Sequence, residues 1–370
     1  MLPYLISFAI STGIIAIIQN WNRRHMGFVF WSAVALFVPC ALAALRSSDI
    51  GTDVNLYVKP MYELACRDLS FSDYQRSSWW SVWHYKSPSD YEPAFAFLIW
   101  AVSRATHSFS AVLFVLQALM IVPIYLCLIR VRKNCPLWLG MAVYYLMFFN
   151  STLNLARQWI AVSFILFAIH YLFDSKRIKY WIIILIASGF HRSALFGILI
   201  FILYQYLVKD GCGVRQVTIV GLVAILSLFV STVLSSLLPV IGLGKYTGYL
   251  GDLDFLPNQI LLRLPMLALL LAYWKKSEDK TVAAFFLGMI FLDMALSQLA
   301  SANEQSGRIA LYFSITAVLY IPAAVSAMGS QASRFGLGTA MMSYCVVYWV
   351  YTYVISGAGE TIPYVFSGVI

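Results

Sequence analysis

The stretch "FSAVLFVLQALMIVPIYLCLI" (109–129) carries no charged residue and is followed at once by the basic link "RVRK" (130–133). A helix of about 20 apolar residues is long enough to cross the ~30 Å hydrocarbon core of a bilayer. Because backbone N–H and C=O groups find no water inside lipid, such a segment must satisfy them internally as a helix. The stretch therefore predicts a membrane-spanning helix that ends at a polar surface.

The rest of the chain has the same character. Of its 370 residues, 61% are hydrophobic and only 11% are charged, whereas soluble domains are about one-quarter charged. We predict an all-α polytopic membrane protein, a single integral membrane domain over 1–370 with about 12 transmembrane helices. The apolar segments fall at about 2–18, 28–45, 109–129, 136–150, 159–173, 180–190, 194–208, 217–238, 259–274, 281–300, 309–327 and 337–355.

Most of the basic residues lie in short links between these segments. Lys and Arg are enriched in cytoplasmic loops, so the net charge of +9 indicates orientation in a membrane and not nucleic-acid binding. Both termini are then expected on the outer face. The basic links are 21–25, 130–133, 174–179, 209–215, 274–280 and 333–335, and the connections expected on the outer face are 46–92, 150–158, 239–258 and 301–308.

Two apolar stretches are too short to cross. The segment "PAFAFLIWAVSRATH" (93–107) would put "RVRK" outside if it spanned the bilayer, so we expect a re-entrant or interfacial helix. The stretch 180–208 joins two cytoplasmic links with arms of only ~21 Å each at 1.5 Å per residue. Its polar turn, "FHRSA" (190–194), then lies below the outer surface, where it requires protein or a water-filled cavity around it.

The outer loop 46–92 contains a helical pattern. In "YVKPMYELACRDLSF" (57–71), helical spacing predicts an amphipathic helix on the membrane surface. The apolar positions of this pattern are Tyr57, Met61, Leu64, Ala65 and Leu69. The aromatic residues at 79–91 fit either an interfacial aromatic belt or stacking against sugars.

Four arginines occupy the expected outer ends of helices or the turn: Arg46, Arg157, Arg192 and Arg308. Ionisable groups at membrane depth are costly and indicate function. Arginine presents bidentate donors that match phosphate, so one interpretation is a shared polyanion. The other interpretation is that each arginine pairs with a local acid, such as Arg46 with Asp49.

Several further residues could act on a substrate. Asp53 and Glu92 are carboxylates on the outer face, suited to general base catalysis, although Glu92 before Pro93 could equally cap a helix. His191 stands beside two polar residues in the predicted turn. Asp293 lies deep in an apolar segment, as a structural acid or as part of a proton path.

The sequence gives no sign of a metal or cofactor. No second histidine stands at metal-ligand spacing, and no P-loop, dinucleotide-binding, GxSxG or HExxH pattern occurs. We therefore expect no metal, no cofactor and no nucleotide-driven transport.

Five blocks of the chain resemble, in order and spacing, the EpsG-like branch of Wzy-type polysaccharide polymerases, which make O-antigen or exopolysaccharide. The resemblance covers roughly residues 1–320, and the family often has lysine where Arg192 stands here. The blocks are "RSSDIGTDVNLY" (46–57), "YEPAFAFL" (91–98), "NLARQWIAVSFILFAIHYL" (154–172), "FHRSALF" (190–196) and "GRIALYF" (307–313).

The resemblance implies a bacterial inner-membrane glycosyltransferase with a GT-C-like fold and its active site facing the periplasm. Its substrates would be undecaprenyl-diphosphate-linked glycans as donor and acceptor, with membrane lipid and a chain-length regulator protein as further partners. The expected catalytic residues are Glu92, Asp53 and His191. The expected substrate-binding residues are Arg46, Tyr57, Arg157, Gln158, Arg192, Arg308 and Tyr312.

Two other functions remain open at this point. A lipid-linked oligosaccharide flippase would also need a basic cavity, but with charges at mid-membrane depth in both halves and often internal repeats. The sequence has no evident repeat, and its candidate residues gather on one face. A membrane acyltransferase would place its histidine and acids near the cytoplasmic side, opposite to the distribution here.

Overall fold

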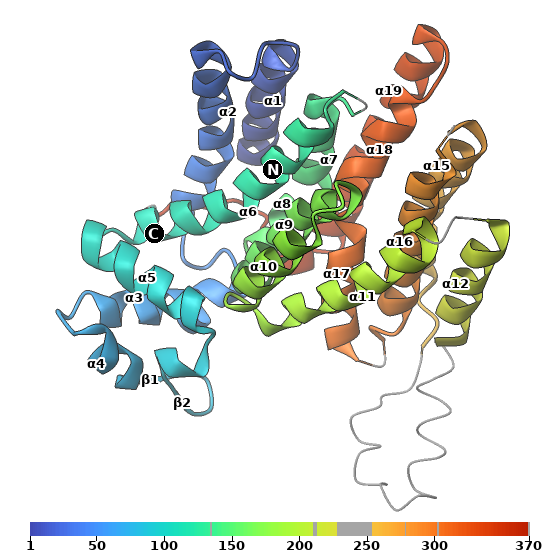
Figure 1. Cartoon of the computed structure of the whole chain (residues 1–370). Coiled ribbons are helices and arrows are strands. Elements are labelled where there is room, and N and C mark those ends of the chain that lie inside the picture. The colour runs from blue at the N-terminus through green and yellow to red at the C-terminus, as the bar shows by residue number, and fades with distance from the viewer. Residues whose placement is uncertain (134, 210–212, 228–253, 278, 302, 369–370) are drawn as a thin grey trace, which may run out of the picture. The chain divides into compact units, whose positions relative to one another are not determined.

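The computed structural model describes residues 1–370 except 134, 210–212, 228–253, 278, 302 and 369–370. The described chain is helical apart from one short hairpin, β1 (Trp79–Trp80) with β2 (Tyr85–Lys86) (Figure 1). Its contacts divide it into two compact units. Unit 1 comprises residues 1–195 and 339–370, and unit 2 comprises residues 196–338.

Six helical segments of the described chain are long and apolar enough to cross a membrane, which confirms a polytopic all-α membrane protein. The predicted number of twelve crossings is not shown. The end of the predicted segment 217–238 and most of the connection 239–258 fall outside the described residues. The candidate spans are Met26–Ala44, Phe109–Val131, Ala156–Phe173, Arg192–Lys209, Lys280–Gln298 and Glu304–Ser326, and the shorter apolar helices are Leu2–Ile18, Pro93–Thr106, Leu137–Met147 and Val214–Leu226.

Unit 1 is built on long apolar helices whose faces are buried against one another. Helix α1 packs on α2 and α7, α6 lies against α2 and α9, and α10 packs on α9. Large side chains such as Trp159 and Tyr145 fill the space between them and are fully buried. The bounds are α1 (Leu2–Ile18), α2 (Met26–Ala44), α6 (Phe109–Val131), α7 (Leu137–Met147), α8 (Phe149–Thr152), α9 (Ala156–Phe173) and α10 (Arg177–Ser188).

The loop 46–92 folds onto α5 (Pro93–Thr106). Its predicted amphipathic helix is present as a π-helical turn, η1 (Val54–Val58), that continues into α3 (Lys59–Ala65). The helix ends at Ala65, so Leu69 lies beyond it, contrary to the predicted pattern. The apolar face is buried against α5 and α6; a position on the membrane surface stays a prediction. Between this helix and α5 follow α4 (Phe71–Arg76), the hairpin and a short 3-10 turn, η2 (Pro88–Asp90).

The polar turn expected at "FHRSA" is a helix break. Helix α10 ends at Ser188, and the chain resumes as a 3-10 turn, η3 (Arg192–Phe196), before α11 (Gly197–Tyr204). The two predicted arms belong to different compact units, so their pairing as a hairpin stays a prediction.

Unit 2 is centred on α16 (Lys280–Gln298), against which α12 (Val214–Ser227), α15 (Leu264–Lys276) and α17 (Glu304–Ser314) all pack. Helix α17 begins at Glu304, so the expected connection 301–308 was too long and Arg308 lies one turn inside a helix. The other elements are η4 (Gln205–Lys209), α14 (Pro257–Leu261), α18 (Ala317–Ser326) and α19 (Gln331–Trp349), the last of which continues into unit 1 as η6 (Val350–Ile355).

Candidate functional site

The first turn of α9 carries the central residue of the site, Arg157. Its Nη1 donates to Glu92 Oε2 at 2.6 Å. Its guanidinium carbon also lies 5.0 Å from the ring centre of Tyr57 and 4.8 Å from that of Tyr91. Arginine is thus held by a charge-assisted hydrogen bond and by two cation–π contacts. The Nε–H of Arg157 is buried and has no acceptor among the described residues.

Glu92 connects three segments of unit 1. It stands at the N-cap position of α5, but its carboxylate accepts no hydrogen bond from the first turn of that helix. Instead Oε1 accepts the backbone N–H of Arg192 at 3.2 Å, while Oε2 binds Arg157. Burial raises the pKa of Glu92, but the attraction of Arg157 and these hydrogen bonds outweigh burial and lower the pKa overall. The capping interpretation of Glu92 is therefore replaced by an ion pair.

Asp53 lies at the other side of Arg157. Its Oδ2 accepts a hydrogen bond from the Tyr57 hydroxyl and one from the backbone N–H of Ala156 at 3.2 Å. The position next to the N-terminus of α9 favours a negative charge there. Burial, and next the charge of Asp53, raise the pKa of Tyr57 well above its usual value. Tyr57 therefore stays protonated and acts as the donor.

Arg46 directly follows α2 and is only 5% exposed. Its Nη2 donates a long hydrogen bond of 3.4 Å to the carbonyl of Leu153, while its Nε–H is buried with no acceptor among the described residues. The expected local partner, Asp49, instead accepts hydrogen bonds from Ser47 and Asn55. Pairing of Arg46 with Asp49 is therefore wrong. Burial lowers the pKa of Arg46 to about 10, so the guanidinium is still charged at neutral pH.

Residues 357–367, which we term the C-terminal strap, cover Arg46. The N–H of Ser47 donates to the carbonyl of Val365, and the N–H of Ser367 donates to the carbonyl of Leu45, each at 2.8 Å. Arg46 itself faces Phe366 across this short antiparallel contact. The sequence pattern gave no indication that this segment returns to the site.

Two asparagines hold the strap and the loop 46–53 to the start of α9. Asn154 accepts the N–H of Thr52 at 2.9 Å and donates to the carbonyl of Gly359 at 2.6 Å. Asn150 donates to the Thr361 hydroxyl at 2.8 Å. Neither asparagine was among the candidates. Their signal in the sequence is the presence of two amides, with Ser151 and Thr152 between them, in a mostly apolar stretch around 145–155, where polar groups are expensive.

A backbone hydrogen bond to Glu92 holds the turn that contains His191 and Arg192 next to the Arg157–Glu92 pair. His191 Nδ1 is 2.5 Å from the Ser193 hydroxyl and accepts the Ser193 N–H at 3.3 Å, so the turn is stabilised by its own serine. The backbone N–H of Arg192 reaches Glu92, while the Arg192 side chain is exposed. A second hydrogen bond, from the backbone N–H of Ala94 to the carbonyl of Gly189 at 3.0 Å, also joins the start of α5 to the residues that follow α10.

The remaining candidates are divided between the units. Gln158 follows Arg157 and is buried in unit 1. Arg308 and Tyr312 belong to α17 in unit 2, where Tyr312 is fully buried and Arg308 pairs with Glu304 at 2.6 Å. For Arg308 the structure thus shows the local ion pair that was the alternative interpretation. A meeting of all four arginines stays a prediction.

A family model matches residues 28–366, and its description is the EpsG family. The chain belongs to the EpsG family. The match extends over both units and includes every candidate residue from Arg46 to Tyr312. This EpsG-family protein is therefore a multi-span membrane protein of polysaccharide biosynthesis. No curated protein and no solved structure matches the chain.

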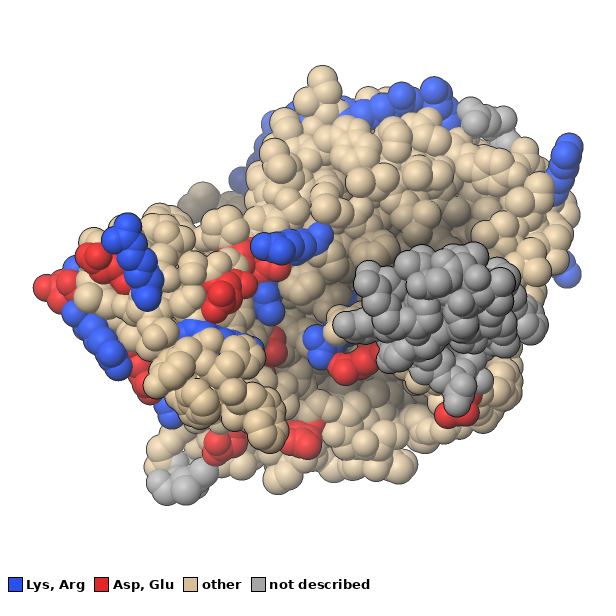
Figure 2. All heavy atoms as spheres, turned by 90° about the horizontal axis from the view of Figure 1, so that it is seen from below, with Lys and Arg blue, Asp and Glu red and all other residues tan. Residues whose placement is uncertain are grey.

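The EpsG-family protein also carries aromatic residues on the hairpin. Trp79 stacks on Tyr91 with ring centres 6.0 Å apart, which extends the ring pair around Arg157 outward. Trp83 and Tyr85 are 85% and 68% exposed. Figure 2 shows acidic and basic side chains gathered over the part of unit 1 that holds α3 to α5, at the left of that view. Both an aromatic belt and sugar stacking remain interpretations of the exposed rings.

The carboxylates of the site are engaged by hydrogen-bond donors. Asp53 binds a hydroxyl and an N–H group, and Glu92 binds Arg157 and an N–H group. Within the described parts of the EpsG-family protein, no three His, Cys, Asp or Glu residues gather as a metal site. The arrangement instead offers positive charge and aromatic faces.

Proposed function

We propose that this EpsG-family protein is a glycosyltransferase that polymerises undecaprenyl-diphosphate-linked oligosaccharide repeat units on the periplasmic side of the bacterial inner membrane. One observation carries the proposal. Arg46 binds the carbonyl of Leu153, four residues before Arg157, and each of the two arginines has a buried Nε–H without an acceptor among the described residues. Such donors suit a diphosphate, which presents several anionic oxygens close together.

The diphosphate is the leaving group of the proposed reaction. The bond between C1 of the donor sugar and the diphosphate oxygen breaks, and C1 forms a new bond to a hydroxyl of the acceptor sugar. Negative charge develops on the departing oxygen, where fixed guanidinium groups in a site of low dielectric are most effective. We assign this stabilisation to Arg157 and Arg46. We retain as proposed substrate-binding residues the other positions that the resemblance implies, which are Arg192 and Gln158 in unit 1 and Arg308 and Tyr312 in unit 2.

The acceptor hydroxyl must lose its proton as it attacks. Glu92 is a weak candidate for this task, because its pKa is lowered and its carboxylate positions Arg157. We therefore assign the base to Asp53, which Tyr57 holds in place. His191, in the turn beside Glu92, orients the diphosphate. The exposed rings of Trp83 and Tyr85 on the hairpin offer flat apolar faces against which a sugar can stack.

The proposed substrates act within the membrane. The donor is a growing glycan on one undecaprenyl diphosphate carrier, and the acceptor is a repeat unit on a second carrier. A chain-length regulator protein would set how many rounds take place. A lipid-linked oligosaccharide flippase would need a charged group available in unit 2 at span depth. The buried pair there, Arg263 with Asp293, is occupied by its own hydrogen bonds.

Reconstitution tests the proposal. Purified protein in detergent receives undecaprenyl-diphosphate-linked repeat units, with and without a chelator, and the products are resolved on a gel. We expect a ladder of repeats, formed about one hundred times more slowly by Arg157→Ala, as for a lost oxyanion donor.

Arg104→Ala is the matched control, because Arg104 pairs with Asp68 at the surface of the same region. Wild-type turnover by Arg157→Ala contradicts the assignment. Folded protein that gives no ladder but moves lipid across vesicles supports a flippase instead.

A further inference from the structure

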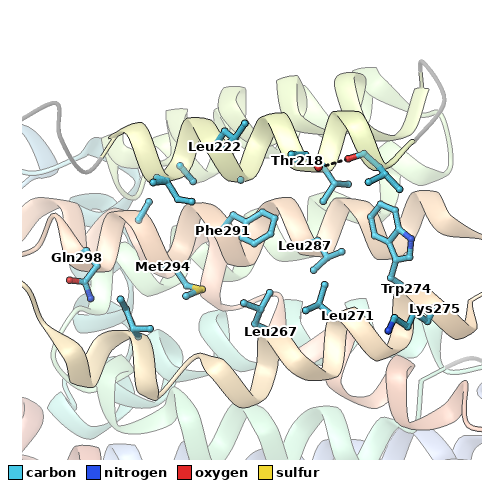
Figure 3. A pocket seen from close by; sticks show the side chains of 17 residues that line it. Thr218, Leu222, Leu267, Leu271, Trp274, Lys275, Leu287, Phe291, Met294 and Gln298 are labelled. Carbon is cyan, nitrogen blue, oxygen red and sulfur yellow. Dashed lines mark hydrogen bonds between the residues drawn. The ribbon is translucent and has the colours of Figure 1, made fainter.

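An apolar groove runs along unit 2. Helices α12 and α15 both pack on α16, and a groove of about 730 Å³ lies between them (Figure 3). Leu287, Phe291 and Met294 of α16 form its floor, with Leu222 on the α12 side and Leu271 on the α15 side. This volume is within the range of roughly 300–1,000 Å³ that is typical of ligand pockets.

The polar groups of the groove differ between its two ends. At one end, Gln298 is engaged with Leu256, donating to its carbonyl at 2.7 Å and accepting its N–H at 3.0 Å. At the other end, Lys275 is exposed, and its ammonium has no hydrogen bond or ion pair to any described residue. Trp274 lies beside Lys275 in Figure 3. The groove therefore ends in one available positive charge.

The length of the groove limits its occupant. It follows α16 from Leu287 to Gln298, which corresponds to roughly 17 Å at 1.5 Å per residue. One leaflet contributes about half of the ~30 Å hydrocarbon core, or roughly 15 Å. The groove is thus as long as a single leaflet is deep. A polyprenyl chain is far longer than this, whereas one acyl chain of a phospholipid fits.

We propose that the groove binds one acyl chain of an anionic phospholipid, with its phosphate on the Lys275 ammonium. A tryptophan beside the charge suits the bilayer interface, where indole rings are enriched. One lysine near an anionic headgroup strengthens binding about fivefold. This inference concerns a lipid that is neither donor nor acceptor, and it stands independently of the proposed glycosyltransferase activity.

Competition between two lipids tests this site. Purified full-length protein in detergent is mixed with equal amounts of phosphatidylglycerol and phosphatidylcholine that carry the same acyl chains, and the bound lipid is measured by native mass spectrometry. We expect about fivefold more phosphatidylglycerol to remain bound. Lys275→Gln should abolish this preference, while Lys133→Gln, an equal loss of charge at an exposed residue of unit 1, should keep it.

A second variant separates the groove from the charge. Leu222→Trp places a larger side chain on the groove wall and should reduce retention of both lipids, with an unchanged elution volume showing that the protein is folded. A preference unaltered in Lys275→Gln overturns the proposal. Displacement of phosphatidylglycerol by undecaprenyl phosphate also overturns the proposal, if Leu222→Trp weakens this displacement and Lys275→Gln leaves it unchanged. The polyprenyl tail of the carrier would then be the occupant of the groove.

Discussion

Among the described residues, each unit contains one largely buried arginine–carboxylate pair, and the two pairs are built differently. In unit 2, Nε and Nη2 of Arg263 bind the two oxygens of Asp293 at 2.7 and 3.0 Å. Nη2 also binds Ser297 at 2.6 Å, and Nη1 binds the side chain and carbonyl of Gln259 at 2.8 and 3.0 Å. All five N–H groups of this guanidinium therefore have acceptors.

In unit 1, Arg157 binds a single carboxylate oxygen, rests against two aromatic rings and keeps a buried Nε–H without an acceptor among the described residues. A saturated guanidinium can only hold helices together, whereas an unsaturated one can still bind an anion. The difference also decides between the two interpretations of Asp293. Its oxygens are fixed by Arg263 and Ser297, which supports a structural acid and not a proton path.

Removal of the saturated arginine should have the largest effect on stability. Arg263→Ala leaves the carboxylate of Asp293, which is 1% exposed, buried without a charged partner. We expect a loss of about 3–5 kcal/mol in the free energy of unfolding, measured by denaturation in mixed micelles. The double variant Arg263→Met with Asp293→Leu should recover most of the stability, because it removes both charges. A stable but inactive double variant would give this pair a role in function and erase the contrast with Arg157.

The surroundings of Arg157 in unit 1 depend on Asn154, which supports the loop 46–53 and the C-terminal strap. Asn154→Ala removes two buried hydrogen bonds, to Thr52 and Gly359. We expect a loss of about 2 kcal/mol in stability together with a slower rate of polymerisation. Asn55→Ala, at an exposed residue of the adjoining turn η1 that binds Asp49, is the control and should change neither quantity measurably. Equal effects of the two variants would show that the strap does not support the site.

Substitution of lysine for Arg157 and for Arg263 should separate an effect on the reaction rate from an effect on stability. Arg157→Lys keeps the charge but loses the planar donor pair, so we expect a rate lower by about tenfold, near the ~1.5 kcal/mol of one charged hydrogen bond. Its stability should remain close to that of the wild type. Arg263→Lys should show the reverse, since Gln259 and Ser297 lose their donors while the reacting groups are untouched. For both variants, the rate of polymerisation and the free energy of unfolding are measured on the same samples.

The smallest expected effect is a pH dependence of the Glu92 ion pair. Because the folded protein lowers the pKa of Glu92, the stability that Glu92 contributes is present above the unfolded value of about 4.3. It is lost as pH falls through the folded pKa. The stability difference between wild type and Glu92→Gln should thus be widest above about pH 5 and narrow in acid. A difference that grows in acid would contradict the ion pair.

Hydrophobic patterning predicted the bounds of several helices closely, but not how many of them are long enough to cross a membrane. The segments 2–18 and 109–129 coincide with α1 and α6 almost to the residue, because a long apolar run in lipid has no alternative to a helix. Twelve full crossings do not follow from the pattern, since α7 and α10 are short. A run of apolar letters carries no information about how deeply each helix enters the bilayer.

Part of the candidate site could be predicted from the sequence, because polar residues are conspicuous in an apolar chain. Arg157, Glu92, Asp53 and Tyr57 were candidates because charge and hydroxyl groups stand out in an apolar chain, and the structure brings these four together. The role of Asn154 was missed, since an amide gives no sign of its distant partners. The strap was missed as well, because its contacts with the loop 46–53 are made through backbone groups that every sequence has.

The strap has a consequence for synthesis. The loop beginning at Arg46 leaves the ribosome more than 300 residues before Val365 and Ser367, which pair with its two neighbours. At about 5–20 residues per second, the loop waits for its partner for roughly 15–60 s. Throughout that interval one cationic side chain is inserted at the membrane without its cover. The candidate site around Arg46 therefore cannot be complete until the C-terminal strap has been synthesised. A chain whose synthesis stops before the strap should never form the complete site.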